Sequence, residues 1–309
     1  MLKQSRIALL FGVAMAISLI ISACGSNSGG TTTTATPTVS TLGTPGSYNC
    51  ISGSITASGS TALAPLVKAV AQQYSTKCPG ATITVNLGGS KTGLANVEAG
   101  SVDIGNSDIP ASSSQSDLVD HQVTVVIFGV IVNKDVTLTN ITTAQLKQIY
   151  SGQVTNWSQV GGPNLPIVVV SRPASSGTRA TFQKYILGGN ETISGPSSLT
   201  TDSTGTVITN VAQNNGAIGY AATGPAKLNS GVTLLSIDGV APTSDNTTTN
   251  MYKFWNIEHM YTKGPATPLA QALIDYMTSS DAKTIAAMQD FIAITDMSPD
   301  AISAHNAVS

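Results

Sequence analysis

The chain has 309 residues, with 14 lysines and arginines against 16 acidic residues and a formal net charge of −2. A negative balance with few basic residues excludes a protein that binds nucleic acid or an anionic membrane through a broad positive field. Any bound anion must therefore be held by local dipoles and a few placed side chains, and the length allows two lobes of ordinary size.

The first 23 residues have the layout of a secretory signal peptide. Lys3 and Arg6 come first, an apolar run covers residues 7–21, and small residues precede Cys24. A retained transmembrane anchor is the alternative, but the run is short for a bilayer span. The four residues ending at Cys24 resemble a bacterial lipobox, which implies that Cys24 becomes the lipidated first residue. Either interpretation places the rest of the chain outside the cytoplasm.

Residues 25–47 carry no charge and almost nothing apolar to bury, and consist mainly of Gly, Ser and Thr. Such a segment behaves as flexible chain. We therefore expect residues 24–49 to form the lipidated cysteine and a tether that holds the folded part away from the membrane surface.

Cys50 and Cys78 remain once Cys24 is assigned to the lipid. In an oxidising compartment an even pair of cysteines predicts a disulfide. Cys50 precedes the first predicted strand and Cys78 ends the first predicted helix, so both fall near the same edge of a sheet. Two isolated buried thiols are the alternative.

From residue 50 onward the sequence predicts strands that alternate with helices, which is typical of a parallel α/β sheet. Strands are expected at 51–57, 81–87, 102–106, 123–132, 167–171, 217–221 and 232–237, and an extended stretch at 251–261. Helices are expected at 61–77, 94–99, 142–150, 178–187, 207–213, 269–278 and 281–291.

The order of these elements predicts two lobes. We expect residues 50–132 in lobe 1, 133–222 in lobe 2, and 223–309 as a return to lobe 1. The chain would cross between the lobes at 123–132 and again at 222–232, and these crossings would act as a hinge. Residues 238–250 are expected to form a mobile loop.

A strand, turn and helix over residues 167–187 give the clearest candidate for an anion site. The helix is expected to begin near Thr178, where free N–H groups and the helix dipole favour negative charge. After the leader, Arg172 and Arg179 are the only arginines of the chain, and both flank this turn. Guanidinium matches a tetrahedral oxyanion. The alternative is a helix cap with two surface cations.

Similar Ser-, Thr- and Gly-containing loops follow three more predicted strands, at residues 57–62, 88–93 and 105–108. One such turn is a weak signal because Ser and Thr are common helix caps. Ligands of open α/β sheets gather at the carboxyl ends of strands. Four such turns at strand ends therefore predict one shared binding site.

Several runs carry a more specific resemblance: GSTALAPLV, GGSKTG, VDIGNSDIP, QLKQIYSGQVTNWSQVGGP and SRPASSGTRATF. In this order, over residues 53–261, they resemble the PstS-type phosphate-binding proteins of ABC importers, in the type II periplasmic-binding-protein superfamily. The resemblance implies an α/β fold of two lobes, each a mostly parallel sheet flanked by helices, joined by a two-strand hinge. It also implies a monomeric extracytoplasmic lipoprotein, without cofactor or metal, that delivers inorganic phosphate to ABC permease subunits and is not an enzyme.

The resemblance also assigns roles to individual residues. Arg172 would hold phosphate bidentately, and Asp108 would accept the hydrogen of a protonated phosphate, which sulfate cannot offer. An Asx turn is the alternative for Asp108. Hydroxyl and main-chain N–H groups would donate to the phosphate oxygens from Thr61, Ala62, Ser90, Ser176, Gly177 and Thr178.

The chain departs from the family at Ala174, where many members carry an acidic residue that orients the arginine. The partner of the Arg172 guanidinium is then missing or comes from elsewhere. We expect Arg179 on the helix surface or at a lobe contact, and Lys91 as a solvated charge at the rim.

The sequence leaves two other functions open. A binding protein or sensor for another oxyanion, such as molybdate or sulfate, would use the same fold. A phosphatase or serine hydrolase would need an activated nucleophile, but the turn around Ser176 lacks the G-x-S-x-G pattern. The three histidines, His121, His259 and His305, have no metal-ligand spacing.

Overall fold

The computed structural model describes residues 49–193, 198–201 and 203–308. The predicted signal peptide, the lipidation at Cys24 and the tether up to residue 48 lie outside these residues. In the described ranges, no helix combines the length and the apolar character that a membrane span requires.

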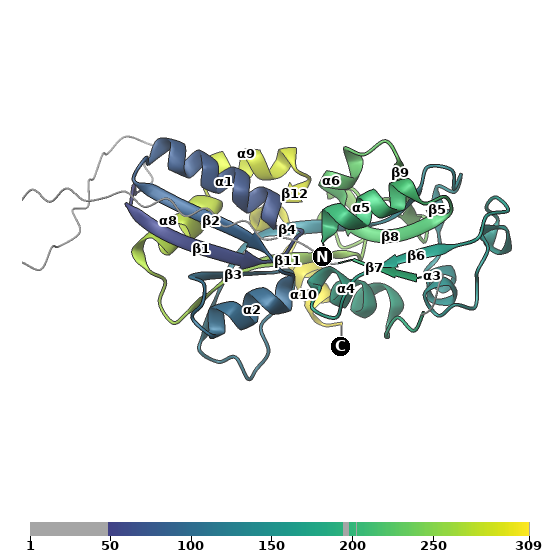
Figure 1. Cartoon of the computed structure of the whole chain (residues 1–309), viewed down its shortest axis with the longest axis horizontal. Helices are drawn as coiled ribbons and strands as arrows, with labels where there is room; N and C mark the ends of the chain where they lie inside the picture. The colour runs from purple at the N-terminus through teal and green to yellow at the C-terminus, as the bar shows by residue number, and fades with distance from the viewer. Residues whose placement is uncertain (1–48, 194–197, 202, 309) are drawn as a thin grey trace, which may run out of the picture. The chain divides into compact units, whose positions relative to one another are not determined.

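The strands of the main sheet are ordered β2-β1-β3-β11-β4-β8-β6-β7, as Figure 1 shows. β12 and β9 also pair with β4, and β10 pairs with β5 apart from the main sheet. The bounds are β1 Gly53–Gly59, β2 Ala81–Leu87, β3 Ile104–Ser107, β4 Leu118–Asn133, β5 Asn140–Ile141, β6 Val168–Ser171, β7 Ser198–Thr200, β8 Ala217–Ala222, β9 Val232–Leu234, β10 Ser236–Ile237, β11 Trp255–Lys263 and β12 Phe291–Ile292.

The long strand β4 belongs to two groups of strands. Its first part pairs antiparallel with β11, and its last part pairs antiparallel with β8. Strands β1, β2 and β3 are parallel to one another, as are β6, β7 and β8. We call the group of β1, β2, β3 and β11 lobe 1 and the group of β6, β7, β8 and β9 lobe 2. The predicted α/β fold of two lobes is confirmed, with antiparallel strands where the lobes join.

The chain returns to lobe 1 later than the sequence predicts. β9 pairs with the end of β4 at residues 131–133, and β10 pairs with β5. Residues 222–237 therefore stay with lobe 2, and the second crossing comes just before β11. The reason is that the predicted strand at 232–237 is divided into two short strands, neither of which reaches lobe 1.

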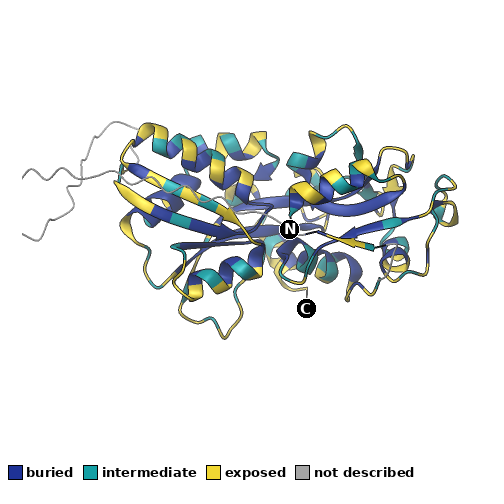
Figure 2. Ribbon diagram, in the orientation of Figure 1, coloured by how far each residue is buried: buried dark blue, intermediate teal, exposed yellow. Residues whose placement is uncertain are grey.

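Helices cover both lobes, and the helix faces turned to the strands are buried, as the dark blue segments of the ribbon in Figure 2 show. In α1, for example, Leu66, Val67, Val70 and Tyr74 are buried at helical spacing. The bounds are α1 Ala64–Lys77, α2 Ser90–Glu98, α3 Thr143–Tyr150, α4 Gly177–Phe182, α5 Thr204–Gln213, α6 Thr223–Lys227, α7 Ser244–Thr248, α8 Pro268–Met277, α9 Ser280–Met288 and α10 Pro299–Asn306.

Some segments differ from the prediction. The helix expected over residues 178–187 is α4 followed by a π-helical turn, Gln183–Leu187. The expected mobile loop at 238–250 contains α7, which Thr243 caps by accepting from the Asn246 amide. α10 was not expected from the sequence, because its polar residues give little apolar periodicity.

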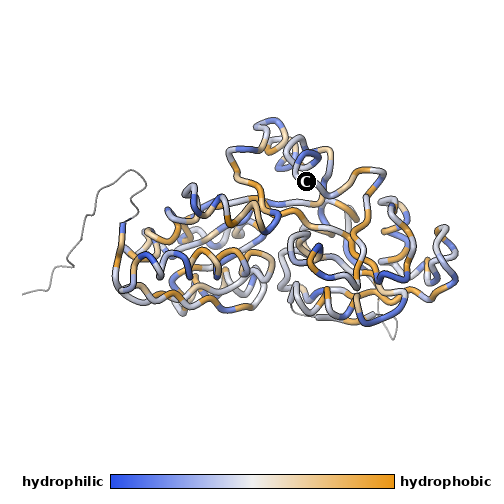
Figure 3. Tube along the Cα trace, turned by 90° about the horizontal axis from the view of Figure 1, so that it is seen from above, coloured by the Kyte–Doolittle hydropathy of each residue, from blue (hydrophilic) through white to orange (hydrophobic). Residues whose placement is uncertain are grey.

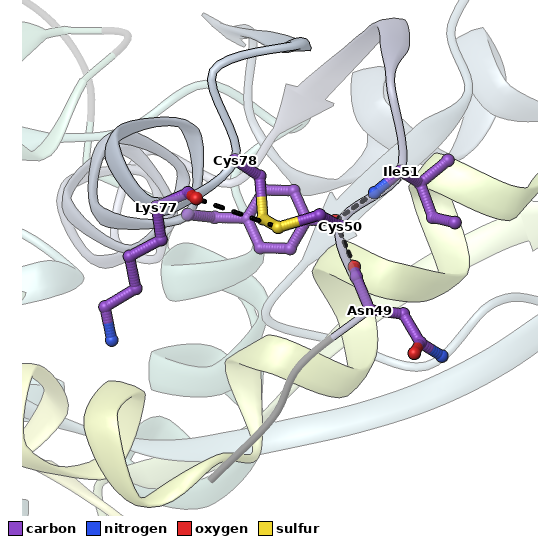
Figure 4. Close-up of a disulfide and its surroundings, with 6 residues drawn as sticks. Asn49, Cys50, Ile51, Lys77 and Cys78 are labelled. Atoms are coloured by element: carbon purple, nitrogen blue, oxygen red, sulfur yellow. Dashed lines mark hydrogen bonds between the residues drawn. A yellow bond between two sulfur atoms is a disulfide. The ribbon is translucent and has the colours of Figure 1, made fainter. Parts of the chain in front are cut away.

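The predicted disulfide is present. Cys50 and Cys78 are bonded, with 5.2 Å between their Cα atoms, and Figure 4 shows the bridge beside the end of α1. Next to it, the Tyr74 hydroxyl donates to the Asn49 carbonyl at 2.6 Å and accepts from the Ile51 amide at 3.1 Å. The bridge and these hydrogen bonds fix the start of the folded chain to α1.

The last helix packs where the two lobes join. Figures 1 and 3 both place the C-terminus near the middle of the described structure. In α10, the His305 ring stacks between Tyr185 of the π-helical turn and Trp255 of β11, with centroids 3.8 and 3.7 Å away. α10 thereby joins an element of lobe 2 to the first residue of β11 in lobe 1.

Candidate anion-binding site

Four helices begin at the ends of strands and meet where the lobes approach each other. α1 follows β1, α2 follows β2, α4 follows β6, and α5 follows β7. The first main-chain N–H groups of a helix have no partner inside the helix, and the dipole makes this end positive. Residues at all four starts contact the opposite lobe: Thr61, Ser90, Lys91, Gly177, Thr178 and Thr204.

Arg172 provides a buried positive charge in this region. It directly follows β6, and its side chain is almost fully buried. Its Nη2 donates to Thr61 Oγ1 at 3.1 Å, across the two lobes. The same Thr61 oxygen accepts from the Thr204 amide, also at 3.1 Å. A buried guanidinium is therefore held against the starts of α1 and α5.

Asp108 is held from both lobes. It is buried, its amide donates to Ser90 Oγ at 2.9 Å, and its Oδ2 accepts from the Thr178 hydroxyl at 2.9 Å. Its Oδ1 has no hydrogen-bond partner among the described residues. Since a buried carboxylate oxygen needs a donor, this atom can accept one more hydrogen, for example from a protonated ligand.

Gly177 allows the two lobes to come together. A Cβ atom at this position would lie 2.3 Å from Ser90 Oγ and 2.9 Å from the Asp108 Cβ, both in lobe 1. Nearby, the Lys91 amide of lobe 1 donates to the Ser175 carbonyl of lobe 2 at 3.1 Å. The described arrangement is therefore one in which the lobes are closed on each other.

Comparison with known proteins identifies the family. A model described as a PBP superfamily domain matches residues 29–281. The phosphate-binding protein PstS of Bacillus subtilis is 46% identical over 251 residues, which cover 80% of this chain and 82% of that protein. The chain belongs to the PstS family, within the PBP superfamily.

Solved structures agree with this PstS-family assignment. A Clostridium perfringens protein, described as a phosphate ABC transporter substrate-binding protein with bound phosphate, is 30% identical with a TM-score of 0.74, and the match covers 78% of this chain and all of that one. An ABC-type phosphate transport receptor from Vibrio cholerae is 28% identical with a TM-score of 0.63, over 77% of this chain and 99% of that one.

Six of the predicted site residues of this PstS-family chain contact another predicted site residue, in two sets. Arg172 contacts Thr61, and the second set consists of Ser90, Asp108, Gly177 and Thr178. Two others have partners within their own turns. The Ala62 amide donates to Ser60 Oγ at 3.1 Å, and Ser176 Oγ caps α4 by accepting from the Arg179 amide at 3.2 Å.

Arg179 supports the turn that carries Arg172. Its Nη1 donates to the Arg172 carbonyl at 2.7 Å, and its Nε lies 3.6 Å from a Glu191 carboxylate oxygen. Glu191 also accepts from the hydroxyls of Ser171 and Tyr220. Burial raises the pKa of Glu191, while these three neighbours act in the opposite direction. Arg179 thus contacts the main chain of the turn, and Ala174 contributes no carboxylate to it.

Three residues beside this region were not predicted from the sequence: Thr204, Asn256 and Glu258. Thr204 had a signal, because Ser203 caps α5 as Ser176 caps α4. Asn256 and Glu258 had none, since they lie in β11, more than 140 residues after Asp108 in the sequence. Only strand pairing brings them beside Asp108.

Proposed function

We propose that this protein is an extracytoplasmic solute-binding protein that captures inorganic phosphate between its lobes and delivers it to the membrane subunits of an ABC importer. The observation that carries the proposal is that Oδ1 of buried Asp108 has no hydrogen-bond partner among the described residues. Its Oδ2 accepts from Thr178, at the start of α4, and buried Arg172 lies at the other end of the turn that leads into this helix. A guanidinium selects an anion, and a free carboxylate oxygen selects an anion that bears a proton. Phosphate at neutral pH meets both conditions.

The other proposed ligand groups are donors from both lobes. Arg172 neutralises the anion, while hydroxyls and amides of Thr61, Ala62, Ser90, Ser176, Gly177 and Thr178 donate to its oxygens. The 46% identity to a phosphate-binding protein over most of the chain supports this assignment. Because the protein is negative overall, these local groups have to provide the attraction. The protein acts by binding and release, without chemical conversion of phosphate.

We also propose a lipid anchor at Cys24 and a monomeric protein. The charged start, apolar run and small residues before Cys24 support export and lipidation. The uncharged segment up to residue 48 would then let the folded part move at the membrane surface and reach the permease.

Isothermal titration calorimetry tests the proposed ligand. Protein freed of bound anion is titrated with phosphate, sulfate and molybdate under the same conditions. We expect micromolar or tighter phosphate binding and no binding of the other two anions. Tight binding of molybdate without phosphate binding would instead identify a binding protein for another oxyanion. Arg172→Lys tests the role of the guanidinium group at constant charge. The variant keeps the positive charge but loses the planar, bidentate guanidinium, and it should bind phosphate much more weakly.

A further inference from the structure

Glu258 is a fully buried carboxyl group whose environment needs an explanation. It lies in β11 with none of its surface exposed. Neither of its carboxyl oxygens has a hydrogen-bond partner among the described residues. An ionised carboxylate without a compensating partner is very costly in such a place, so a simple packing role does not account for this residue.

Strand pairing places Glu258 beside Asp108. β11 and β3 pair antiparallel with His259 opposite Ser107, so Glu258 is level with the residue that follows β3. Asn256 lies two positions earlier on β11 and therefore on the same face. Its Nδ2 donates to the Asp108 carbonyl at 2.6 Å. One face of β11 thus holds the main chain of Asp108 and presents a carboxyl group next to its side chain.

The neighbouring elements offer little other charge to Glu258. Across the strand pair on β4 stands Thr124, whose hydroxyl donates to the Ile292 carbonyl at 2.9 Å. From α4, the neutral hydroxyls of Thr178 and Thr181 contact Asp108 and Asn256. Farther along β11, His259 is paired with Asp120 at 2.8 Å, and Arg172 lies across the site against Thr61. Burial and then the adjacent Asp108 carboxyl hold the pKa of Glu258 well above its usual range.

We propose that Glu258 is a positioning residue that keeps a proton and shares it with Asp108, so that the pair carries a single negative charge toward the ligand. This inference rests on the proposed phosphate site. A neutral Glu258 can donate to Asp108, which leaves Asp108 ionised with an oxygen ready to accept the hydrogen of the ligand. An ionised Glu258 would place a second negative charge behind the acceptor and repel the anion.

The test compares wild type with Glu258→Gln, which has the same shape and a donor but cannot ionise. Phosphate affinity is measured by calorimetry from acid to alkaline pH. At pH values where Glu258 of the ligand-free protein has lost its proton, phosphate binding requires that proton to return. In this range wild-type affinity should fall about tenfold per pH unit relative to the variant. The titration of phosphate itself affects both proteins equally and cancels in the ratio. A wild-type affinity that rises relative to the variant as the pH rises would overturn the proposal, because it would show that the site needs an ionised Glu258.

An infrared measurement on ligand-free protein separates this inference from the proposed function. A protonated Glu258 should give the C=O stretching band of a carboxylic acid near neutral pH, and Glu258→Gln should lack this band. Absence of the band in wild type would refute the proton assignment. If the band is present but wild type binds no phosphate, the proposed function fails while the protonation of Glu258 stands.

Discussion

Arg172 and Thr61 are joined by a hydrogen bond of 3.1 Å between Nη2 and Oγ1, which connects lobe 2 to lobe 1 at the starts of two helices. The Thr61 oxygen also accepts from the Thr204 amide at 3.1 Å. The Thr61 hydroxyl of lobe 1 therefore aligns two groups of lobe 2, the Arg172 guanidinium and the start of α5. The same oxygen therefore contributes both to the contact between the lobes and to the orientation of Arg172.

Thr61→Val should weaken phosphate binding substantially. The substitution removes a proposed donor to phosphate and leaves the Thr204 amide without its acceptor. The loss of a buried hydrogen-bond partner costs about 2 kcal/mol, which corresponds to a factor of about 30 in the dissociation constant. Thr61→Ser keeps the hydroxyl and should bind nearly as tightly as wild type. Equal affinities of Thr61→Val and wild type in calorimetry would contradict this role.

Gly177→Ala should prevent closure without unfolding either lobe. The added Cβ would meet Ser90 and Asp108 of the other lobe at less than 3.0 Å. We expect a loss of phosphate affinity and no phosphate-induced compaction in small-angle X-ray scattering. Gly205→Ala is the matched control, because a Cβ at Gly205 has no atom within 4 Å. If Gly177→Ala closes on phosphate like the control, the proposed lobe contact is wrong.

The sequence predicted the parts of the site that lie in local strand-turn-helix units. Ser90, Gly177 and Thr178 belong to turns whose composition signals a helix start, so each was found without knowledge of the fold. Glu258 could not be found in this way, because its position beside Asp108 depends on the pairing of β11 with β3. Similarly, the later return to lobe 1 depends on the partners of β9 and β10, which hydrophobic pattern alone does not specify.

Removal of the disulfide should destabilise lobe 1. Cys50 and Cys78 are 28 positions apart, and a crosslink that closes such a loop contributes about 3.5 kcal/mol in the chain-entropy description. The double variant Cys50→Ser/Cys78→Ser should therefore unfold at lower denaturant concentration, and reductant should lower the midpoint of wild type to the same value. A wild-type midpoint that is insensitive to reductant would contradict a stabilising bridge.

His305 should make folding stability depend on pH below neutrality. Burial, followed by Lys184 and Lys253, lowers the pKa of His305 to about 3. Since the folded pKa is below the ordinary value, the stabilisation is complete above about pH 6.5 and is lost as the pH falls toward the folded value. The loss relative to a non-titrating variant is at most about 1.4 kcal/mol per pH unit.

His305→Phe is the non-titrating variant for this comparison. It keeps an aromatic ring between Tyr185 and Trp255 and removes the proton-binding nitrogens. Denaturant unfolding of both proteins between pH 4 and pH 7 measures the difference. We expect wild type to lose stability faster than the variant on acidification. Equal slopes would show that folding does not change the pKa of His305.

The discrimination between phosphate and sulfate in wild type and Asp108→Asn tests the central claim most directly. In wild type, Oδ1 of Asp108 should favour the protonated anion by a factor of about 100 or more. The side-chain amide that Asp108→Asn introduces can donate to either anion, so the ratio of the two dissociation constants should fall to within about tenfold. Similar wild-type affinities for phosphate and sulfate, or an unchanged ratio in the variant, would contradict the account.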